Sequence, residues 1–147
     1  MKIILNSDGG SRGNPGNAGC GAVVSSEAGE VLKTEARGLG TMTNNEAEYW
    51  GVITAMELAK KAFGEEKRKS LQVEARMDSE LVCKQLNGEY QVKEERLWPL
   101  FMKVWNLRVK DFKNITFKYV PREQNGRADE LANEAMDKAA GVGGLFS

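Results

Sequence analysis

Short apolar runs separated by polar or glycine-rich turns dominate the first forty residues. Runs at residues 3–5 and 20–24 predict two strands, and a turn at residues 27–30 leads to a third predicted strand at 31–39. Residues 7–16 hold four glycines and a proline, which predicts a sharply turning loop directly after the first strand. Because the connections are short, we expect the three strands to form an antiparallel meander.

The pattern changes to a helical period after Thr43. Thr43 and Glu46 have the spacing of a capping box, and apolar residues then recur around much of a helix that extends to about residue 63. This helix is expected to lie buried against the sheet. Alternating apolar residues at 71–77 predict a fourth strand that ends at Asp78. A strand, a helical crossover and another strand predict parallel pairing of the first and fourth strands.

Helices and a strand alternate in the second half of the chain. A short helix is predicted at residues 80–86, a fifth strand at 115–120, and a last helix from residues 126–127 onward. A longer helix is predicted between the short helix and the fifth strand. Its apolar residues are Leu97, Phe101, Val104 and Trp105.

The composition fits a single globular domain at residues 1–140, followed by a short glycine-rich tail at 141–147. Hydrophobic residues make up 41% and charged residues 29% of the 147 residues. No apolar run has the length of a membrane span and no secretory leader is visible, so we expect a cytoplasmic protein without membrane contact. Lys and Arg (21) balance Asp and Glu (21), so nucleic-acid contacts would come from local basic residues or bound cations.

The chain has no histidine, and its only cysteines are Cys20 and Cys83. The missing histidine excludes Ser–His and Cys–His catalysis and His-ligated zinc sites. The two cysteines are expected to be free, buried thiols. Carboxylates are then the obvious catalytic groups, and their hard oxygen atoms select Mg²⁺ or Mn²⁺.

Four acidic residues lie where the predicted fold would bring them together. Asp8 is on the first strand and Asp78 ends its parallel neighbour, while Glu48 shares the apolar face of the crossover helix and Asp129 begins the last helix. The alternative for Glu48 and Asp129 is an ordinary acid favoured by the helix dipole. Converging carboxylates repel and raise one another's pKa, and two divalent cations would relieve this and could drive phosphodiester cleavage.

Four motifs in this order resemble the type 1 ribonuclease H family: strand-Asp-Gly-Gly, Thr-Asn-Asn-x-x-Glu, Asp-Ser, and Arg-Ala-Asp-Glu-Leu-Ala-Asn. The resemblance covers about residues 2–138. It implies a mixed five-stranded sheet of order 3-2-1-4-5 with helices on both faces. It also implies an endoribonuclease that hydrolyses the RNA strand of RNA–DNA hybrids with two Mg²⁺ ions and leaves 5′-phosphate and 3′-hydroxyl ends. Mn²⁺ is expected to substitute. The implied metal ligands and catalytic acids are Asp8, Glu48, Asp78 and Asp129.

The resemblance also implies substrate contacts. Amide side chains would meet the hybrid through the minor groove and the RNA 2′-hydroxyls, and a 2′-hydroxyl both donates and accepts hydrogen bonds. Thr43 matches a residue of a DNA-phosphate pocket, and Trp98 matches an aromatic residue of a DNA-binding channel. The alternatives are that Thr43 only caps its helix and that Trp98 belongs to the core. The remaining implied contacts are Gly9, Gly10, Asn14, Asn44 and Asn45.

The chain departs from the family pattern at two places. Many members carry a mobile histidine before the last acid, whereas this loop carries Arg122, as in a subgroup with arginine there. Arginine cannot act as a base, but it could hold a phosphate. Well-known bacterial members also insert a basic helix that grips the hybrid. Only residues 87–93, with one lysine, separate the helices here, as in archaeal and reverse-transcriptase-like members. Glu80 also occupies a position that is often neutral and polar, which affects the expected substrate affinity.

Three other functions remain open at this point. A nuclease of the same kind could also cut double-stranded RNA, or the fold could survive as a catalytically weak hybrid-binding module. An actin-like phosphotransferase shares the early Asp-Gly signal, but it needs two lobes, and the chain also lacks the Gly-x-x-x-x-Gly-Lys-Ser/Thr motif. We expect the nuclease to act as a monomer.

Overall fold

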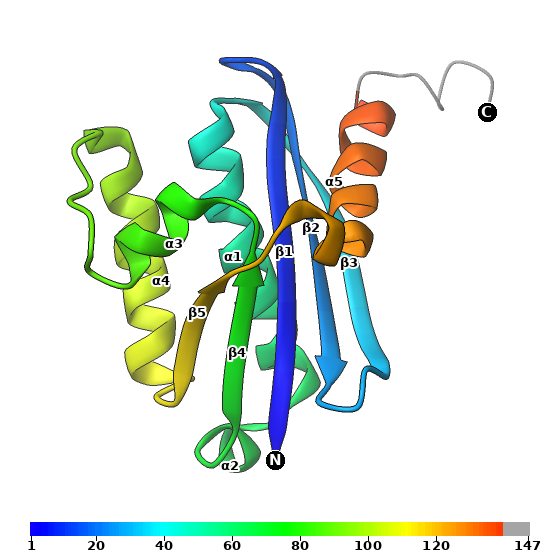
Figure 1. Ribbon diagram of the computed structural model, residues 1–147, viewed down its shortest axis with the longest axis vertical. Helices are drawn as coiled ribbons and strands as arrows, with labels where there is room; N and C mark the ends of the chain where they lie inside the picture. Colours follow the sequence, from blue (N-terminus) through cyan, green and yellow to red (C-terminus); the bar gives the residue numbers. More distant parts are fainter. Residues whose placement is uncertain (140–147) are drawn as a thin grey trace.

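A five-stranded mixed sheet forms the centre of the computed structural model, which describes residues 1–139 (Figure 1). Its order, β3-β2-β1-β4-β5, is the predicted order 3-2-1-4-5. The predicted tail at 141–147 lies outside the described residues. The strands are β1 (Lys2–Gly13), β2 (Gly16–Ser26), β3 (Val31–Met42), β4 (Gln72–Met77) and β5 (Ile115–Tyr119). The helices are α1 (Asn44–Ala62), α2 (Glu65–Arg68), α3 (Glu80–Leu86), α4 (Trp98–Lys110) and α5 (Gly126–Ala139), with 3₁₀ turns η1 (Glu95–Leu97) and η2 (Arg122–Gln124).

The strand pairing follows the predicted rules. β1, β2 and β3 form the antiparallel meander, while β1 pairs with β4 and β4 with β5 in parallel. The crossover through α1 therefore gives the parallel pair expected for a strand–helix–strand unit.

The prediction of a glycine-rich loop directly after Asp8 was wrong for most of its length. β1 continues as a strand through Gly13 and pairs with β2 as far as Gly16, so the turn itself is only two residues long. Gly13, with a φ of 98°, serves this turn. Gly9 serves close packing instead, since a Cβ there would lie 2.0 Å from the backbone oxygen of Ala47 in α1. Asp8 consequently lies in the middle of β1, and the residues on both sides of it also pair with β2.

Two neighbouring glycines show that helices cover both faces of the sheet. A Cβ on Gly9 would meet α1, whereas a Cβ on Gly10 would meet Met136 of α5 at 3.7 Å. Because successive strand residues point to opposite faces, α1 and α5 lie on opposite sides (Figure 1). This confirms the predicted layer arrangement.

The main core lies between the sheet and the layer formed by α1, α3 and α4. Tyr49, Ile53 and Met56 of α1 are fully buried there. Both cysteines are buried and free, as predicted. None of the described helices combines the length and the apolar character needed to cross a membrane.

The predicted apolar side of α4 is only partly core. Leu97 and Val104 are buried, but Phe101 is only partly buried and Trp105 is 48% exposed. The register of α4 turns Val104 inward, and Trp105, the next residue along the helix, consequently faces solvent. The charged connection at residues 64–70 also contains the one-turn helix α2, which had not been predicted.

Candidate active site

Asp8, Glu48 and Asp78 converge at the point where β1 and β4 part. The last paired residues of these strands are Ser7 and Met77, so Asp8 and Asp78 each follow directly. One carboxylate oxygen from each of the three acids lies within 4.8 Å of the other two. The predicted convergence is therefore present for these three residues.

Close helix packing brings Glu48 to the strand. The predicted capping box of α1 is present, since the Thr43 hydroxyl accepts from the Glu46 N–H at 3.2 Å and Glu46 accepts from the Thr43 N–H at 3.0 Å. It fixes where α1 begins and thus places Glu48 in the second turn. A Cβ on Gly51, one turn later, would lie 2.8 Å from the backbone oxygen of Asp8, so only glycine permits this approach.

Burial and mutual repulsion raise the pKa of two of the carboxyl groups. The pKa of Asp8 is raised to about 8, mainly by burial, with further contributions from the charge of Asp78 and from the close approach of Asp129 and Asp78. Burial also raises the pKa of Glu48 well above its usual value, together with the charges of Asp8 and Asp78. The Gly9 N–H, which donates to Asp8 Oδ1 at 2.9 Å, opposes the shift of Glu48.

The donor set fits a hard divalent cation. Asp78 Oδ2 is buried and accepts no hydrogen bond from any described residue. A buried carboxylate oxygen without a donor is costly unless a cation neutralises it. The three acids offer only oxygen ligands, which suit Mg²⁺ or Mn²⁺ better than zinc or copper.

Asp129 lies beside Asp8 but outside the three-carboxylate cluster. Its carboxyl approaches that of Asp8 closely enough to raise the pKa of Asp8. Its backbone N–H is bonded to the oxygen of Asn125, in the first turn of α5. The structure therefore brings the fourth predicted acid to the edge of the site.

Asn125, which the sequence reading missed, ties the loop before α5 to β1. Its side chain is buried, donates from Nδ2 to the Ser7 backbone oxygen at 2.8 Å, and accepts at Oδ1 from Asn6 at 3.1 Å. Its own N–H donates to the oxygen of Arg122 at 2.9 Å. Through its side chain and its backbone, this one residue links the strand residue before Asp8 with the Arg122 turn and the start of α5. An asparagine between a charged turn and a glycine is typical of an ordinary turn, so the sequence did not indicate that Asn125 supports the site.

Arg122 reaches the site from η2. Its Nε lies 3.8 Å from Asp78 Oδ2, while the side chain remains 81% exposed. The loop therefore brings its charge over the carboxylate cluster, as the sequence led us to expect of its position.

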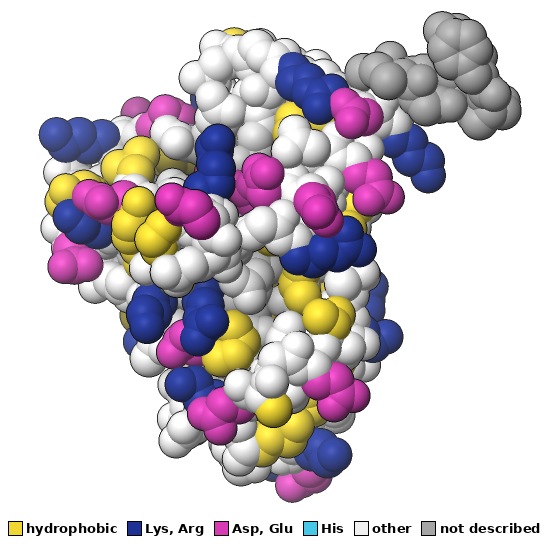
Figure 2. Space-filling view, turned by 45° about the vertical axis from the view of Figure 1, so that its right-hand side comes forward, with side chains coloured by type: hydrophobic (Ala, Val, Ile, Leu, Met, Phe, Trp, Pro, Cys, Tyr) yellow, Lys and Arg dark blue, Asp and Glu magenta, His cyan; other side chains and the backbone are white. Residues whose placement is uncertain are grey.

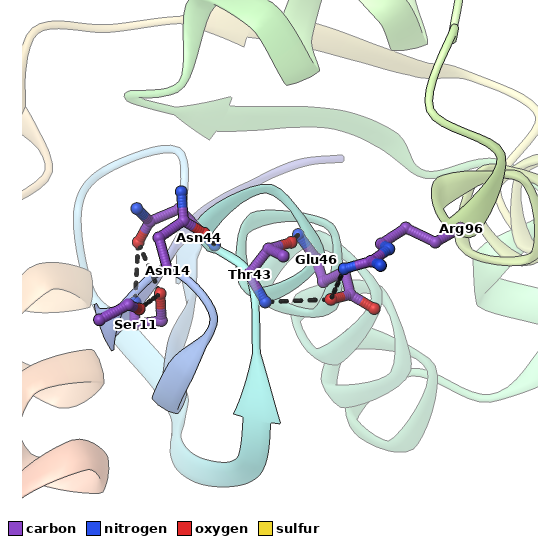
Figure 3. A network of polar contacts seen from close by, with 7 residues as sticks. Ser11, Asn14, Thr43, Asn44, Glu46 and Arg96 are labelled. Carbon is purple, nitrogen blue, oxygen red and sulfur yellow. Dashed lines mark hydrogen bonds and ion pairs between the residues drawn. The ribbon is translucent and has the colours of Figure 1, made fainter.

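The side-chain amide oxygens of Asn14 and Asn44 point toward backbone N–H groups and accept hydrogen bonds from them (Figure 3). Asn44 Oδ1 accepts from the Ser11 N–H at 2.9 Å, and Asn14 Oδ1 accepts from the Asn44 N–H at 3.1 Å. Because a backbone N–H can be met only by an oxygen, the orientation of both amides is fixed. Their NH₂ groups are the ends left to donate to a ligand.

The next predicted substrate contacts are Thr43, Gly9, Gly10 and Trp98. Thr43 caps α1 and accepts one hydrogen bond, so its hydroxyl proton remains able to donate. Gly9 and Gly10 are in β1 next to Asp8. Trp98 is 52% exposed, which excludes the core alternative, and its indole N–H donates to the Val92 oxygen at 2.8 Å.

Asn45 opens onto a groove of about 530 Å³ between α1, α3 and the segment before α4. Leu81, Tyr90 and Lys93 are among its lining residues, and Trp98 is not. The Tyr90 ring is 46% exposed and has Lys84 Nζ 5.0 Å from its centroid. The aromatic residue that faces the groove is therefore Tyr90, which sequence reasoning overlooked because a tyrosine in a short turn has no periodic signal.

The surface near the site carries mixed charge. Figure 2 shows Lys and Arg side chains interspersed with Asp and Glu on this face. Between α3 and α4 the described chain forms only the single turn η1, so the basic helix of some bacterial ribonucleases H is missing, as predicted.

Comparisons with known proteins give one consistent family. A family model described as reverse transcriptase-like matches residues 6–135. Ribonuclease HI of Halobacterium salinarum is 40% identical over 132 residues, which are 90% of this chain and 63% of that protein. The bifunctional protein Rv2228c of Mycobacterium tuberculosis is 42% identical over 141 residues, 95% of this chain and 37% of that protein. The chain thus spans less than two thirds of either relative.

Solved structures agree with the sequence relatives. LC11-RNase H1, isolated from compost by a metagenomic approach, was solved in complex with an RNA/DNA hybrid. It superposes with a TM-score of 0.90 at 46% identity, covering 94% of this chain and 99% of that one. RNase H1 of Halobacterium salinarum superposes with a TM-score of 0.85 at 36% identity, covering 94% and 99%.

Proposed function

Because this chain belongs to the reverse-transcriptase-like family of ribonuclease H domains, we propose that it is an endoribonuclease that hydrolyses the RNA strand of RNA–DNA hybrids. The observation that carries the proposal is the cluster of Asp8, Glu48 and Asp78, in which a buried Asp78 oxygen accepts no hydrogen bond from the described residues. A binding module without catalysis would gain nothing from three acids that repel one another.

Asp8, Glu48 and Asp78 would hold the divalent cations, with Asp129 at the edge of the site. When bound, a pair of Mg²⁺ ions would activate a water molecule and stabilise the leaving oxygen, and Mn²⁺ would substitute. Bound cations would lower the raised pKa values of Asp8 and Glu48 and would favour their ionised forms. Cleavage is accordingly expected to leave 5′-phosphate and 3′-hydroxyl ends.

The other side chains would position the hybrid. The hydrogen-bonded amide oxygens of Asn14 and Asn44 leave two NH₂ donors for acceptors in the minor groove or for 2′-hydroxyl oxygens. The Thr43 hydroxyl would donate to a DNA phosphate, and the groove beside Asn45 would receive part of the DNA strand. Arg122 would bind the scissile or freed phosphate through its planar guanidinium. Action as a monomer and in the cytoplasm belongs to the same proposal.

A cleavage assay tests the function directly. The chain and its Asp8→Asn variant would be incubated with matched RNA–DNA hybrid, RNA duplex and DNA duplex, each with Mg²⁺, with Mn²⁺ and with chelator. We expect metal-dependent cutting of RNA in the hybrid by the parent and none by Asp8→Asn. Equal cutting of RNA duplex would broaden the substrate class. Hybrid binding without cutting under any metal condition would refute the nuclease and leave the binding module.

A further inference from the structure

α4 exposes a row of large apolar side chains on the side away from the core. Trp98, Met102, Trp105 and Val109 are 52%, 54%, 48% and 51% exposed. Their spacings of four, three and four residues place them on one stripe along about 16 Å of helix. The opposite side of the same helix already serves the core through Val104. α4 therefore has two apolar sides, and the described residues cover only one. We call these four residues the outer stripe.

The outer stripe has partly fixed geometry. The Trp98 ring is anchored by its hydrogen bond to the Val92 oxygen. The Arg108 guanidinium lies 5.8 Å from the centroid of the Trp105 ring, within the range of a cation–π contact. Large apolar surfaces of this kind mark interaction sites more often than chance exposure, because isolated apolar residues seldom line up.

The charged residues of α4 beside the outer stripe are all basic, and the nearest preceding acids, Glu94 and Glu95, lie before the helix. α4 carries Lys103, Arg108 and Lys110, and no Asp or Glu occurs from residue 96 to residue 110. This contrasts with the whole chain, whose charges cancel. Lys103 Nζ also lies 4.9 Å from the centroid of the Trp50 ring, so one flank continues onto α1.

We propose that the outer stripe is the docking surface for an amphipathic helix with acidic flanks, supplied by a segment other than residues 1–139. The four-three-four spacing is that of a helix–helix seam, in which flanking charges choose the partner. A second copy of α4 is disfavoured because it would bring basic flanks against basic flanks. Nucleic acid is disfavoured because Met102 and Val109 offer no ring on which a base could stack.

Two synthetic peptides of about two heptads test the proposal. They share leucines at the seam positions and differ only in having glutamate or lysine on the flanks. Binding to the full chain is measured by calorimetry and by the fluorescence of the tryptophans. Met102→Glu disrupts the outer stripe, and Val31→Glu, at a 55% exposed site on β3, is its matched control. Far-ultraviolet circular dichroism and thermal melts establish that each variant is folded.

We expect the acidic peptide to bind at least about tenfold more tightly than the basic one, with a blue shift of the tryptophan emission. Met102→Glu should weaken this binding about tenfold or more, and Val31→Glu should leave it unchanged. Lys103→Glu combined with Arg108→Glu should reverse the preference between the peptides.

Three outcomes would overturn the proposal. The first is equal or absent binding of the two peptides. The second is a dimer in sedimentation that Met102→Glu abolishes, which would make a second copy the occupant. The third is tighter binding of a single-stranded oligonucleotide that Met102→Glu abolishes, which would make the occupant a nucleic acid. None of these readouts depends on hybrid cleavage, so the proposed nuclease function stands or falls separately.

Discussion

At the scale of single residues, the site holds buried carboxylates that repel one another, and a bound metal cation would relieve this repulsion. Asp8 is 7% exposed and lies among other acids, and its pKa is raised to about 8. Asp78 keeps an oxygen without a donor. Groups selected for folding alone would be paired or replaced, because buried unpaired carboxylates cost stability. The arrangement is therefore explained by ligand binding, and its cost should be measurable in the metal-free chain.

Asp8→Asn should stabilise the metal-free chain at pH 8 by roughly 1 to 3 kcal/mol, or several degrees in Tm. A carboxyl whose pKa rises on folding binds more protons in the native state, so its contribution to stability falls as pH rises from about 4 to about 8. The gain should nearly vanish at pH 4, where Asp8 is protonated in the native state. Thermal melts in chelator at both pH values measure it. Glu134→Gln, at an exposed acid without an ion pair to any described residue, is the control, and an equal gain at both pH values would contradict the mechanism.

Arg122→Ala should lower the steady-state cleavage rate about tenfold or more, since losing a charge-assisted contact costs roughly 1.5 to 3 kcal/mol. Arg122→Lys should recover only part of the rate, because a point charge replaces a planar fork. Kinetics at fixed Mg²⁺ provide the measurement. Arg127→Ala, which removes an exposed arginine paired with Glu130, is the matched control. If both alanine variants cleave at the parent rate, the 3.8 Å approach of Arg122 to Asp78 has no catalytic role.

Asn125→Ala should lower the maximal rate and raise the Mg²⁺ concentration needed for half-maximal activity, while the KM for hybrid changes little. Its side chain holds the start of α5 and the Arg122 turn against the strand residue before Asp8. Asn87→Ala removes a comparable bond, to the Phe117 oxygen at 3.0 Å, outside the site. Thermal shift by Mg²⁺ provides a second readout. A loss of stability equal to that of Asn87→Ala, with unchanged Mg²⁺ response, would mean that Asn125 is only structural.

At the scale of elements, the site depends on how closely α1 approaches β1. Gly9 faces the backbone of Ala47 and Gly51 faces the backbone of Asp8, and a Cβ at either position would overlap a main-chain atom. The approach brings the second turn of α1 against the middle of β1, which is why Glu48 and Asp8 meet. The glycines after Asp8 therefore serve packing as much as substrate access.

Gly9→Ala should destabilise the chain by about 2 to 4 kcal/mol, because its Cβ would sit 2.0 Å from the Ala47 oxygen and neither backbone can move freely. Gly10→Ala is the matched control on the same strand, since its Cβ would make an ordinary 3.7 Å contact with Met136. It should be neutral or slightly stabilising. Chemical denaturation measures both. Similar stability of the two variants would show that α1 can retreat from β1 without cost.

Sequence patterns predicted the antiparallel meander, the parallel pairing of β1 with β4 and the main helices because period and connection length determine them, whereas the full sheet order came from the family resemblance. The patterns misjudged the residues directly after Asp8, since glycine in a sequence signals a turn, whereas Gly9 marks a tight helix–strand contact that appears only in three dimensions. The acids could be found because motif order preserves them. Asn125 and Tyr90 could not, because their roles come from contacts between segments distant in sequence.

At the scale of the whole molecule, charge balance limits how the chain can hold a polyanion. The net charge is zero, and the described surface near the site mixes both signs (Figure 2). Arg12 is paired with Asp137, and Arg96 Nη1 lies 3.9 Å from Glu46 Oε1. Few cations near the groove are left for phosphates, and Lys93 is the one that lines it.

The hybrid should therefore bind weakly and with a shallow salt dependence. The slope of log affinity against log salt is about 0.7 to 0.9 per neutralised phosphate, so three or four contacts predict a slope of about −3. Affinity of the Asp8→Asn chain for a hybrid, measured at several salt concentrations and constant Mg²⁺, provides the value without cleavage. Lys93→Ala should make the slope shallower by about one, whereas Lys33→Ala, an exposed lysine on β3, should leave it unchanged. A slope near −6 would reveal several phosphate contacts beyond those that the groove supplies. A shallow slope of about −3 would instead fit the missing basic helix, which leaves the groove and the amide donors as the main contacts. Recognition would in that case rest on hybrid shape and 2′-hydroxyls more than on charge.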